Sequence, residues 1–457
     1  MNFRSRILAC VSCAVLLSGC TADLGGALDL GGGNASGAPA TALVVGDEPY
    51  AVQAGALILR QGGSAADAAT AMYFALAVTY PVAAGLGGGG ICIVRDAARN
   101  RSEEFDFLAR DSAAGGAYAV PGNVRGFGEM QATYGALPWQ RDVTPGEGYA
   151  AAGFPISHAL FARLTAAQDV IRLDASLANE FIDESGATKP IGTVVSSPEL
   201  AQTLAAIRMG GPNAFYRGTT GARILAYSSL QGGAMGVPEL AHYGVMRSSP
   251  QLMQIGNETV LLPSARTGAG AFAGTLFDTL NRALGTSVGE NDLQASVVVA
   301  VKQALARFNV TALPKDLGAT GFAAIDANGQ SVACAVTMNG PFGSGHTAQG
   351  TGVTLARAPS SGDQGLAAAF LTPVIALEGS GMALAGAGAG GPNATASIGY
   401  ALARLARGEP LSQRGDLRST GVAPFETINA IVCQSGACVA LPDPAANGLG
   451  ASGSTAQ

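Results

Sequence analysis

Histidine is the side chain most often found at metal and acid–base sites, and this sequence has three of them. They are His158, His242 and His346, and none stands at ligand-like spacing from another histidine or from a cysteine. Ser344 lies two residues before His346, too close for the two to be mutual catalytic partners, and no Gly-x-Ser-x-Gly elbow surrounds it. We therefore expect no metal site and no serine–histidine hydrolase centre.

A glycine pattern near the C-terminus raises the question of a nucleotide cofactor. Gly386, Gly388 and Gly391 fit Gly-x-Gly-x-x-Gly, and Glu409 follows at a distance typical of dinucleotide-binding folds. However, Glu409 sits in an Arg-Gly-Glu-Pro turn after a predicted helix, and not at the end of a second strand. We therefore expect no cofactor.

The N-terminus has the pattern of an export signal. Residues 1–19 hold two arginines, Arg4 and Arg6, then an apolar stretch too short to span a bilayer, and Leu-Ser-Gly leads into Cys20. This resembles a bacterial lipobox, which implies cleavage before Cys20 and acylation of its thiol and amine. The alternative is an ordinary secretory signal. Thr21 follows where an aspartate would signal inner-membrane retention, so we expect a lipid-anchored envelope protein at the outer membrane, facing the periplasm.

The segment after Cys20 and the remaining cysteines fit that location. Residues 20–42 are rich in Gly, Ala, Ser and Pro without periodicity and predict a flexible tether. Cys433 and Cys438 flank a glycine-bearing turn, so a hairpin disulfide is predicted in an oxidising compartment. Cys92 and Cys334 lie in apolar strands and are interpreted as small buried side chains.

Composition narrows the class of protein further. The chain has 457 residues, 48% of them hydrophobic, and a net charge of −6. The apolar fraction indicates a folded protein with a large core. The net negative charge does not predict the positively charged surface that is typical of nucleic-acid binding, so no nucleic-acid partner is expected.

Helices and strands alternate along the chain. Two helices are predicted within 48–80, broken at Gly62-Gly63, with Ser64 and Asp67 as a capping box. Further helices are predicted at 157–167, 199–208, 272–284 and 292–308. The stretch 317–345 predicts a β-hairpin, because Asn328-Gly329 between apolar runs is typical of a two-residue turn with positive φ. A mixed α/β (α+β) class follows.

Several motifs, in order along the chain, resemble the γ-glutamyltranspeptidase family. They are Gln-Gly-Gly-x-Ala-x-Asp-Ala-Ala at 61–69, Gly-Leu-Gly-Gly-Gly-Gly at 85–90, Val-Pro-Gly-x-Val-x-Gly at 120–126 and Phe-Tyr-x-Gly at 215–218. The resemblance implies a four-layer αββα N-terminal-nucleophile (Ntn) hydrolase sandwich. Residues 43–318 would correspond to the large subunit and residues 319–457 to the small subunit of one domain.

The family transfers or hydrolyses the γ-glutamyl group of glutathione-type substrates with a threonine that self-cleavage makes N-terminal. The freed amine serves as the base for the hydroxyl of the same residue. When the family pattern is anchored on Asp326, the nucleophile position falls on Ala319, which has no hydroxyl. Thr320 is the neighbouring candidate, but it reaches the same face only if a bulge realigns the strand.

Other site residues are partly retained in this resemblance. Thr337 corresponds to the threonine that bonds the nucleophile, Asn339 to a substrate-holding asparagine, and Gly390 and Gly391 to the oxyanion glycines. The same glycines would also serve a turn without any chemistry. Leu108 replaces the arginine that holds the glutamyl carboxylate, although Arg110 lies two residues on.

The positions for the amine holder and for a serine pair have changed as well. Ser360-Ser361 stands where the family has an aspartate, with Asp363 nearby, and Ala369-Phe370 replaces the serine pair.

Three hypotheses follow. The protein is a γ-glutamyl hydrolase or transferase with impaired activity, a non-catalytic homologue that binds a small γ-glutamyl or peptide-like ligand or a partner, or an Ntn amidohydrolase of changed specificity that uses Thr320.

Overall fold

The computed structural model describes residues 42–284, 289–419 and 421–453. The predicted signal at 1–19, Cys20 and all of the tether except Ala42 lie outside the described residues. No helix in the described ranges is long and apolar enough to cross a membrane.

The first sheet has seven strands and draws on both halves of the chain. Its order is β17-β1-β9-β10-β2-β3-β6, and each printed pairing in it is antiparallel. The strands are β17 (Leu449–Ser452), β1 (Leu43–Gly46), β9 (Ala319–Ile325), β10 (Gln330–Thr337), β2 (Gly89–Asp96), β3 (Arg101–Phe107) and β6 (Met246–Ser248). Residues 43–318 and 319–457 are therefore interleaved in one sheet.

The second sheet has six strands in the order β16-β15-β14-β13-β8-β7. They are β16 (Ala437–Leu441), β15 (Thr427–Gln434), β14 (Gly381–Ala389), β13 (Thr372–Glu378), β8 (Glu258–Leu262) and β7 (Gln251–Ile255). Its inner face packs on the first sheet through β9 and β10, which contact β14, β15 and β13. The interface is filled by small and branched side chains such as Val45, Ala323, Ile375 and Ile431.

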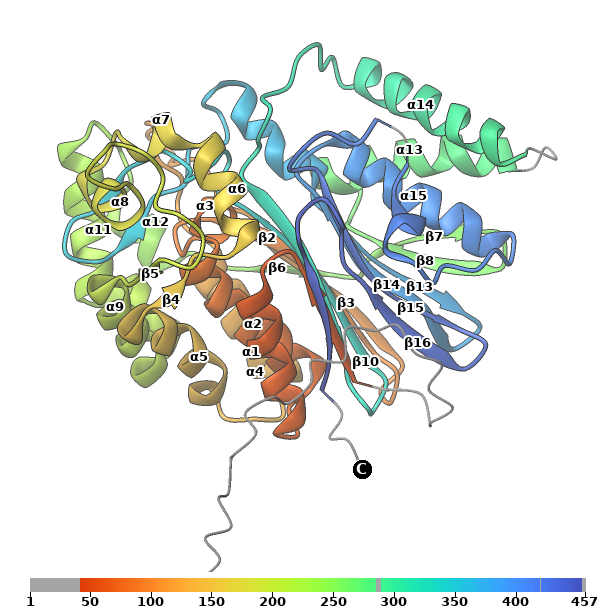
Figure 1. Cartoon of the computed structure of the whole chain (residues 1–457), viewed down its shortest axis with the longest axis horizontal. Coiled ribbons are helices and arrows are strands. Elements are labelled where there is room, and N and C mark those ends of the chain that lie inside the picture. The colour runs from red at the N-terminus through yellow and green to blue at the C-terminus, as the bar shows by residue number, and fades with distance from the viewer. Residues whose placement is uncertain (1–41, 285–288, 420, 454–457) are drawn as a thin grey trace, which may run out of the picture. The chain divides into compact units, whose positions relative to one another are not determined.

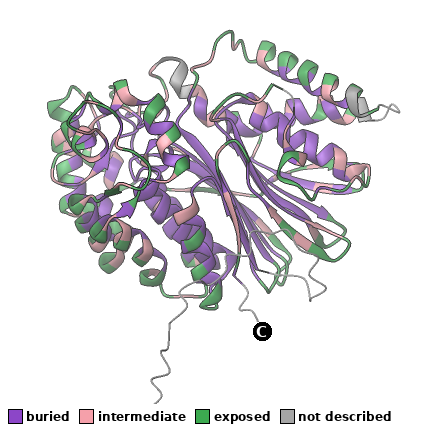
Figure 2. Cartoon of the chain, in the orientation of Figure 1, coloured by how far each residue is buried: buried purple, intermediate pink, exposed green. Residues whose placement is uncertain are grey.

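Helices cover the outer face of each sheet (Figure 1). The first sheet is covered by α1 (Pro49–Arg60), α2 (Ala65–Thr79) and α4 (Asn123–Tyr134), and α5 (Trp139–Ala152) packs on α2. The second is covered by α13 (Gly268–Leu284) and α15 (Pro392–Ala406), and α14 (Glu290–Arg307) packs on these two helices. Figure 2 shows the buried residues concentrated in the strands and in the helix faces turned toward them. This is the expected αββα sandwich, and the predicted fold class is confirmed.

Shorter elements connect these layers. They are α3 (Pro81–Ala84), β4 (Phe154–Pro155), α6 (His158–Ala166), α7 (Gln168–Ile171), α8 (Ala175–Phe181), β5 (Val194–Val195), α9 (Pro198–Gly210), α10 (Pro212–Arg217), α11 (Thr219–Leu230), α12 (Val237–Ala241), β11 (Thr347–Ala348), β12 (Val353–Thr354) and the 3-10 helices η1 (Gly362–Phe370) and η2 (Arg414–Leu417). The predicted helices at 157–167, 199–208, 272–284 and 292–308 correspond to α6, α9, α13 and α14.

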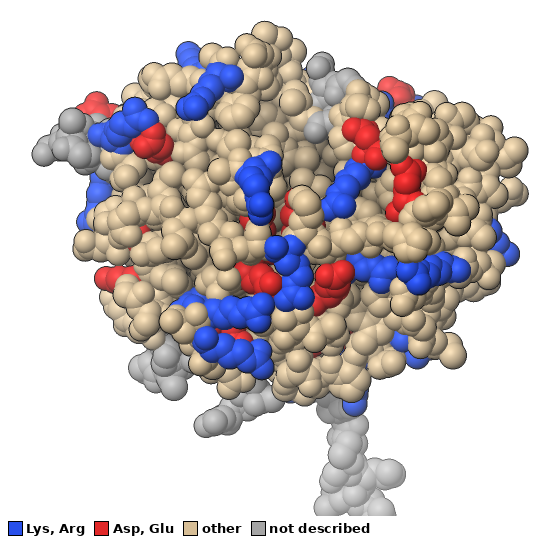
Figure 3. Space-filling view, turned by 180° about the vertical axis from the view of Figure 1, so that it is seen from behind, with Lys and Arg blue, Asp and Glu red and all other residues tan. Residues whose placement is uncertain are grey.

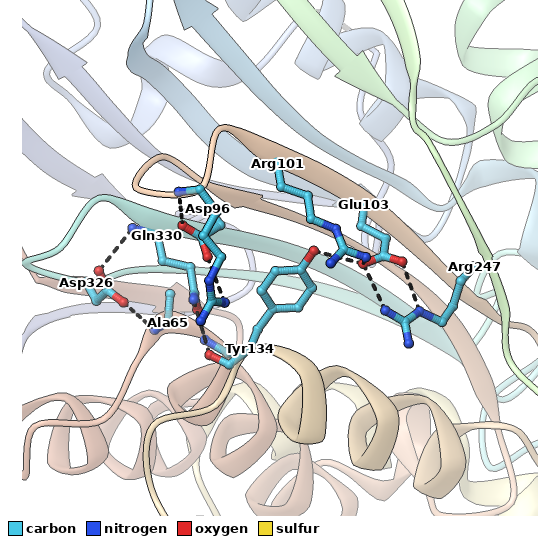
Figure 4. Close-up of polar contacts among 10 residues, drawn as sticks. Ala65, Asp96, Arg101, Glu103, Tyr134, Arg247, Asp326 and Gln330 are labelled. Atoms are coloured by element: carbon cyan, nitrogen blue, oxygen red, sulfur yellow. Dashed lines mark hydrogen bonds and ion pairs between the residues drawn. The ribbon is translucent and has the colours of Figure 1, made fainter.

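Helix α2 begins as the sequence predicted. Ser64 and Asp67 form the reciprocal capping box, because Ser64 Oγ accepts from the Asp67 N–H and the Asp67 carboxylate accepts from the Ser64 N–H. The hairpin turn adds a second cap, since Asp326 Oδ2 accepts from the Ala65 N–H at 3.0 Å and Gln330 Oε1 accepts from the Ala66 N–H at 2.9 Å. Asp326 thus ties the hairpin to α2 (Figure 4).

A second polar group joins the helices to the same sheet. Glu103 on β3 accepts hydrogen bonds from Tyr134 of α4, from Arg101 and from Arg247 of β6 (Figure 4). Partial burial acts to raise the pKa of the Glu103 carboxyl, but the hydrogen bonds from Arg247 and Tyr134 and the charges of the two arginines lower it below its usual value. On the face in Figure 3, Lys and Arg side chains lie among Asp and Glu side chains in a mostly uncharged surface.

The turn of the predicted hairpin differs in detail. Gly329 has a φ of +82°, but Asn328 is not in the left-handed region. Asp326 Oδ1 accepts from the N–H groups of Asn328 and Gln330, so the loop holds three residues, Ala327 to Gly329, between the paired ends. The aspartate's own turn chemistry replaced the expected two-residue turn.

Two disulfides are present in the structure. Cys433 and Cys438 are joined across the β15–β16 turn, where they are direct partners in the ladder. Cys92 and Cys334 are also joined, so the interpretation of these two as separate buried thiols is wrong. They lie opposite each other on β2 and β10 with their Cα atoms 4.1 Å apart, a register that places both sulfurs on one face.

Candidate active site and its empty nucleophile position

Ala319 begins β9 opposite Thr337 of β10. It is fully buried, and its methyl group belongs to a small apolar cluster between the sheets. The other members are Ala335, Leu371, Ala387 and Ala389, with Leu108 packed against them. The position that should hold a nucleophile is therefore an apolar contact, and Leu108, which packs against it, stands where the family resemblance predicts the arginine that holds the glutamyl carboxylate.

The peptide group before Ala319 is held by several hydrogen bonds. The Gly318 carbonyl accepts from Thr337 Oγ1 at 2.9 Å and from the Met338 N–H at 2.8 Å. The Gly318 N–H donates to Asp316 Oδ1 at 2.7 Å. Two donors on one carbonyl draw electron density from its carbon, so this carbon is polarised for nucleophilic attack. However, the peptide lacks an adjacent hydroxyl that could attack it.

A buried ion pair fixes the approach to this peptide. Arg163 of α6 pairs with Asp316 through two hydrogen bonds, and its Nη1 donates to the Ala319 carbonyl at 2.9 Å. The guanidinium also lies 5.4 Å from the ring centroid of Tyr80 and 5.2 Å from that of Phe425. Burial acts to lower the pKa of Arg163, but Asp316 raises it above its usual value, so the cation persists. The sequence gives no sign of this pair, because 153 positions separate its members.

Thr320 does not take the place of Ala319. It is fully buried outside the Ala319 cluster, and its Oγ1 donates to Asp47 Oδ2 at 2.7 Å. Asp47 also accepts from Thr427 and Asn429 of β15, so its carboxyl joins three hydrogen-bond donors between the sheets. Burial raises the pKa of Asp47 even though these hydrogen bonds lower it. The Thr320 hydroxyl is thus a structural donor, and Thr320 pairs with Val336 in a β9–β10 ladder that has no bulge.

The structure does bring Thr337 and Asn339 to the predicted place. Asn339 has a φ of +56°, and its N–H donates to Thr337 Oγ1 at 2.9 Å. Its Nδ2 donates to the Arg357 carbonyl, while its buried Oδ1 has no hydrogen-bond partner among the described residues. An unpaired buried acceptor is unfavourable by about 1–3 kcal/mol, so this amide is suited to receiving a ligand donor.

Gly390 and Gly391 lie at the start of α15. Gly390 has a φ of +93°, which requires glycine, and Gly391 is the N-cap residue in an extended conformation. The carboxylate of Glu426 occupies this helix start, where it accepts from the N–H and the Nδ2 of Asn393 and from the Ala423 N–H. An internal carboxylate therefore already uses part of the positive helix end that an oxyanion would need.

Arg110 lies beyond β3, where its backbone pairs with Val120. Its guanidinium stacks 4.8 Å from the ring centroid of Tyr243, and its buried Nη2 has no hydrogen-bond partner among the described residues. Tyr243 in turn donates to the Leu108 carbonyl at 2.7 Å. Ser360 bonds Asp111, and the Ser361 hydroxyl bonds the Ala358 carbonyl, whereas the side chain of Asp363 lies outside the described set. Phe370 is buried in the core of the second sheet.

Two packed sheets between helical layers, with a site at the first residue of an inner strand, define an Ntn-hydrolase fold. The family model "Gamma-glutamyltranspeptidase" matches residues 51–307, more than half of the chain. The chain therefore belongs to the γ-glutamyltranspeptidase family, as its motifs indicated.

The sequence relatives have related names. The "Glutathione hydrolase proenzyme" of Pseudomonas aeruginosa is 29% identical over 374 residues, which cover 68% of this chain and 66% of that protein. "Glutathione hydrolase 2" of Arabidopsis thaliana is 31% identical over 233 residues, covering 48% of this chain and 40% of the relative. The chain thus spans less than two thirds of the length of these relatives.

Solved structures share the fold at lower identity. The cephalosporin acylase from Bacillus halodurans superposes with a TM-score of 0.71 at 18% identity, covering 90% of this chain and 96% of that one. The γ-glutamyltranspeptidase of Helicobacter pylori gives a TM-score of 0.52 at 24% identity, covering 57% of this chain and 81% of that one. At these identities the likeness concerns the fold.

Proposed function

We propose that this protein is a non-catalytic γ-glutamyltranspeptidase homologue of the bacterial cell envelope, which keeps the family fold as a single uncleaved chain. The observation that carries the proposal is the methyl group of Ala319, packed among Leu108, Leu371 and alanines at the nucleophile position. Neither self-cleavage nor acyl transfer proceeds without a nucleophile. The engagement of Thr320 by Asp47 argues against that hydroxyl as a substitute.

The state of the purified chain tests this proposal. We expect one polypeptide and no fragment that begins at residue 319 or 320, together with no release of anilide from a γ-glutamyl anilide. Intact-mass measurement and N-terminal sequencing would reveal cleavage. A fragment beginning at Thr320, with activity that Thr320→Ala abolishes, would instead establish the amidohydrolase hypothesis.

The retained function that fits the site is binding of a small γ-glutamyl or peptide-like ligand. Arg110 supplies a cation with an unused N–H, and Asn339 supplies an unused amide oxygen. A ligand carboxylate would bind the Arg110 guanidinium, and a ligand amine would donate to the Asn339 amide oxygen. Thermal shift with glutamate and with γ-glutamyl peptides tests this, with Arg110→Met and Asn339→Leu each expected to abolish a shift seen in the parent protein.

The envelope location rests on the lipobox around Cys20 and is supported by two disulfides, which persist in oxidising compartments. The membrane would be the partner of the acylated N-terminus. Metabolic labelling with palmitate is expected to mark the protein, and Cys20→Ala should lose the label and release the protein from the outer-membrane fraction. Unlabelled parent protein in the soluble fraction would exclude the anchor.

A further inference from the structure

The disulfide between Cys433 and Cys438 lines a cleft at one end of the sandwich. The cleft has a volume of about 430 Å³, a size typical of sites for small molecules. It is lined by residues of the β9–β10, β13–β14 and β15–β16 turns. Its walls include Ile325, Ser331 and Met382, and the Ser331 hydroxyl contacts the Met382 sulfur at 3.2 Å.

The two disulfides differ in their access to solvent. Cys92 and Cys334 are completely buried within the first sheet and its helical layer. Cys433 and Cys438 are each partly exposed, at the end of β15 and in β16. Because thiol–disulfide exchange requires the attacking thiolate to reach a sulfur atom, the second bond is open to reaction in the folded protein and the first is not.

The hairpin does not depend on the Cys433–Cys438 bond for its position. The two cysteines are five residues apart and already face each other in the β15–β16 ladder, so the bond closes a very short loop. Stabilisation by loop closure grows with loop length, and the Cys92–Cys334 bond spans 242 positions. Gln434 also anchors the hairpin, since its side chain accepts from the Leu411 N–H and donates to the Glu409 carbonyl. A reduced pair would therefore stay aligned and could close again.

We propose that Cys433 and Cys438 form a reversible redox site that exchanges with low-molecular-weight thiols bound in this cleft. A thiolate attacks one of the two sulfurs, a mixed disulfide forms, and the other cysteine leaves as a thiolate that takes up a proton. A second thiolate then attacks the sulfur of the small molecule in the mixed disulfide. Two small thiols are oxidised to their disulfide, and the protein disulfide gains two electrons and two protons.

The charge around the cleft selects among thiols. Among the described residues that line it, the charged ones are Asp326 and Glu378. Asp326 is buried and bonded to backbone N–H groups, whereas Glu378 is exposed at the end of β13. An exposed carboxylate attracts a cationic thiol and repels an anionic one. The site therefore favours cysteamine over glutathione, which carries a net negative charge.

The experiment follows the four disulfide-bonded cysteines in the folded full chain. The protein is incubated with cysteamine or glutathione, quenched with acid, alkylated and mapped by mass spectrometry. We expect Cys433 and Cys438 to become alkylated roughly tenfold or more faster than Cys92 and Cys334, since access controls the rate. Rates are compared per thiolate, and cysteamine should react several-fold faster than glutathione. Removal of the thiol should restore the disulfide in air.

Glu378→Gln is the matched variant, because it removes the charge and keeps the shape. It should bring the cysteamine and glutathione rates together while Cys92 and Cys334 stay joined. Equal rates for both disulfides in the parent protein, or no reduction of Cys433–Cys438 without denaturant, would overturn the redox site. A thiol preference that Glu378→Gln leaves unchanged would overturn the selection by charge. Neither result bears on whether the chain cleaves itself, so the two proposals fail separately.

Discussion

Thr337 donates a hydrogen bond from its Oγ1 to the carbonyl oxygen of Gly318, the residue directly before the empty nucleophile position, at 2.9 Å. The Met338 N–H binds the same oxygen at 2.8 Å. Donors aimed at a carbonyl stabilise the oxyanion that forms when its carbon is attacked. In this protein the attack has no source, because Ala319 ends at its methyl group.

This geometry predicts that a hydroxyl at position 319 restores cleavage. Ala319→Thr should give slow cleavage between residues 318 and 319, because the new hydroxyl would lie beside a carbonyl that is already polarised. Ala319→Val has the same shape without the hydroxyl and is the control. Intact mass over several days checks the outcome.

A second substitution shows whether Thr337 acts through the carbonyl. In the Ala319→Thr background, Thr337→Val should slow cleavage by about tenfold or more, in line with the loss of one oxyanion donor. If Ala319→Thr folds and remains one chain, the hydrogen bonds on Gly318 do not amount to a processing site. Cleavage of Ala319→Val would exclude a role for the hydroxyl.

The buried Arg163–Asp316 pair predicts that substituting Arg163 alone lowers the free energy of unfolding more than substituting both residues. Arg163→Met should lower the free energy of unfolding by about 3–5 kcal/mol, because it leaves the Asp316 carboxylate buried without its cation. The double variant Arg163→Met with Asp316→Asn should recover part of that loss. Urea denaturation of both variants measures the difference. Equal losses in the single and double variants would show that the two side chains are not energetically coupled.

Much of the fold was accessible from the sequence because its signals are local. Ser64 and Asp67 lie three residues apart, and the hairpin strands flank their own turn, so helix starts and hairpin could be predicted directly. The αββα arrangement came from the motifs shared with the family. The Cys92–Cys334 bond and the Arg163–Asp316 pair could not be predicted, because each depends on strand register or helix packing between distant segments.

The missing nucleophile of the site could be predicted from the sequence, whereas most contacts around its position could not. The lack of a hydroxyl at Ala319 can be read from the alignment of motifs alone. Other features of the site depend on the packing of the two sheets. Leu108 and Leu371 pack around Ala319, Asp47 accepts a hydrogen bond from Thr320, and Glu426 caps α15. No periodicity in the sequence encodes these contacts.

Asp142 predicts how stability depends on pH. Burial in α5, with the nearby Asp67 carboxylate as a further cause, raises the pKa of Asp142 from 3.8 to about 10. The folded chain therefore holds a proton between these two values that the unfolded chain releases. Stability from this group is fully present below about pH 4 and falls as the pH rises toward 10.

Asp142→Asn tests this sign, because the amide keeps the shape of the protonated acid. The variant should be less stable than or equal to the parent at pH 4 and gain relative to it at each higher pH. Thermal unfolding midpoints from pH 4 to pH 9 measure the trend. A difference between variant and parent that is constant across this range would contradict a proton held on Asp142.

Gly318 is predicted to be irreplaceable because of its backbone and its surroundings together. Its φ is +59°, and a Cβ atom there would lie 1.9 Å from the Gly340 carbonyl oxygen. Gly62 has a φ of +83° with no atom within 4 Å of the corresponding position, so it isolates the effect of the dihedral angle. Gly62→Ala should lower the free energy of unfolding by about 1 kcal/mol. Gly318→Ala should lower it several-fold more, because the hairpin entry must move away from Gly340. Denaturant midpoints for the two variants measure these losses. Equal losses of stability would contradict the prediction, because they would mean that Gly340 can move away from the new Cβ atom at no energetic cost.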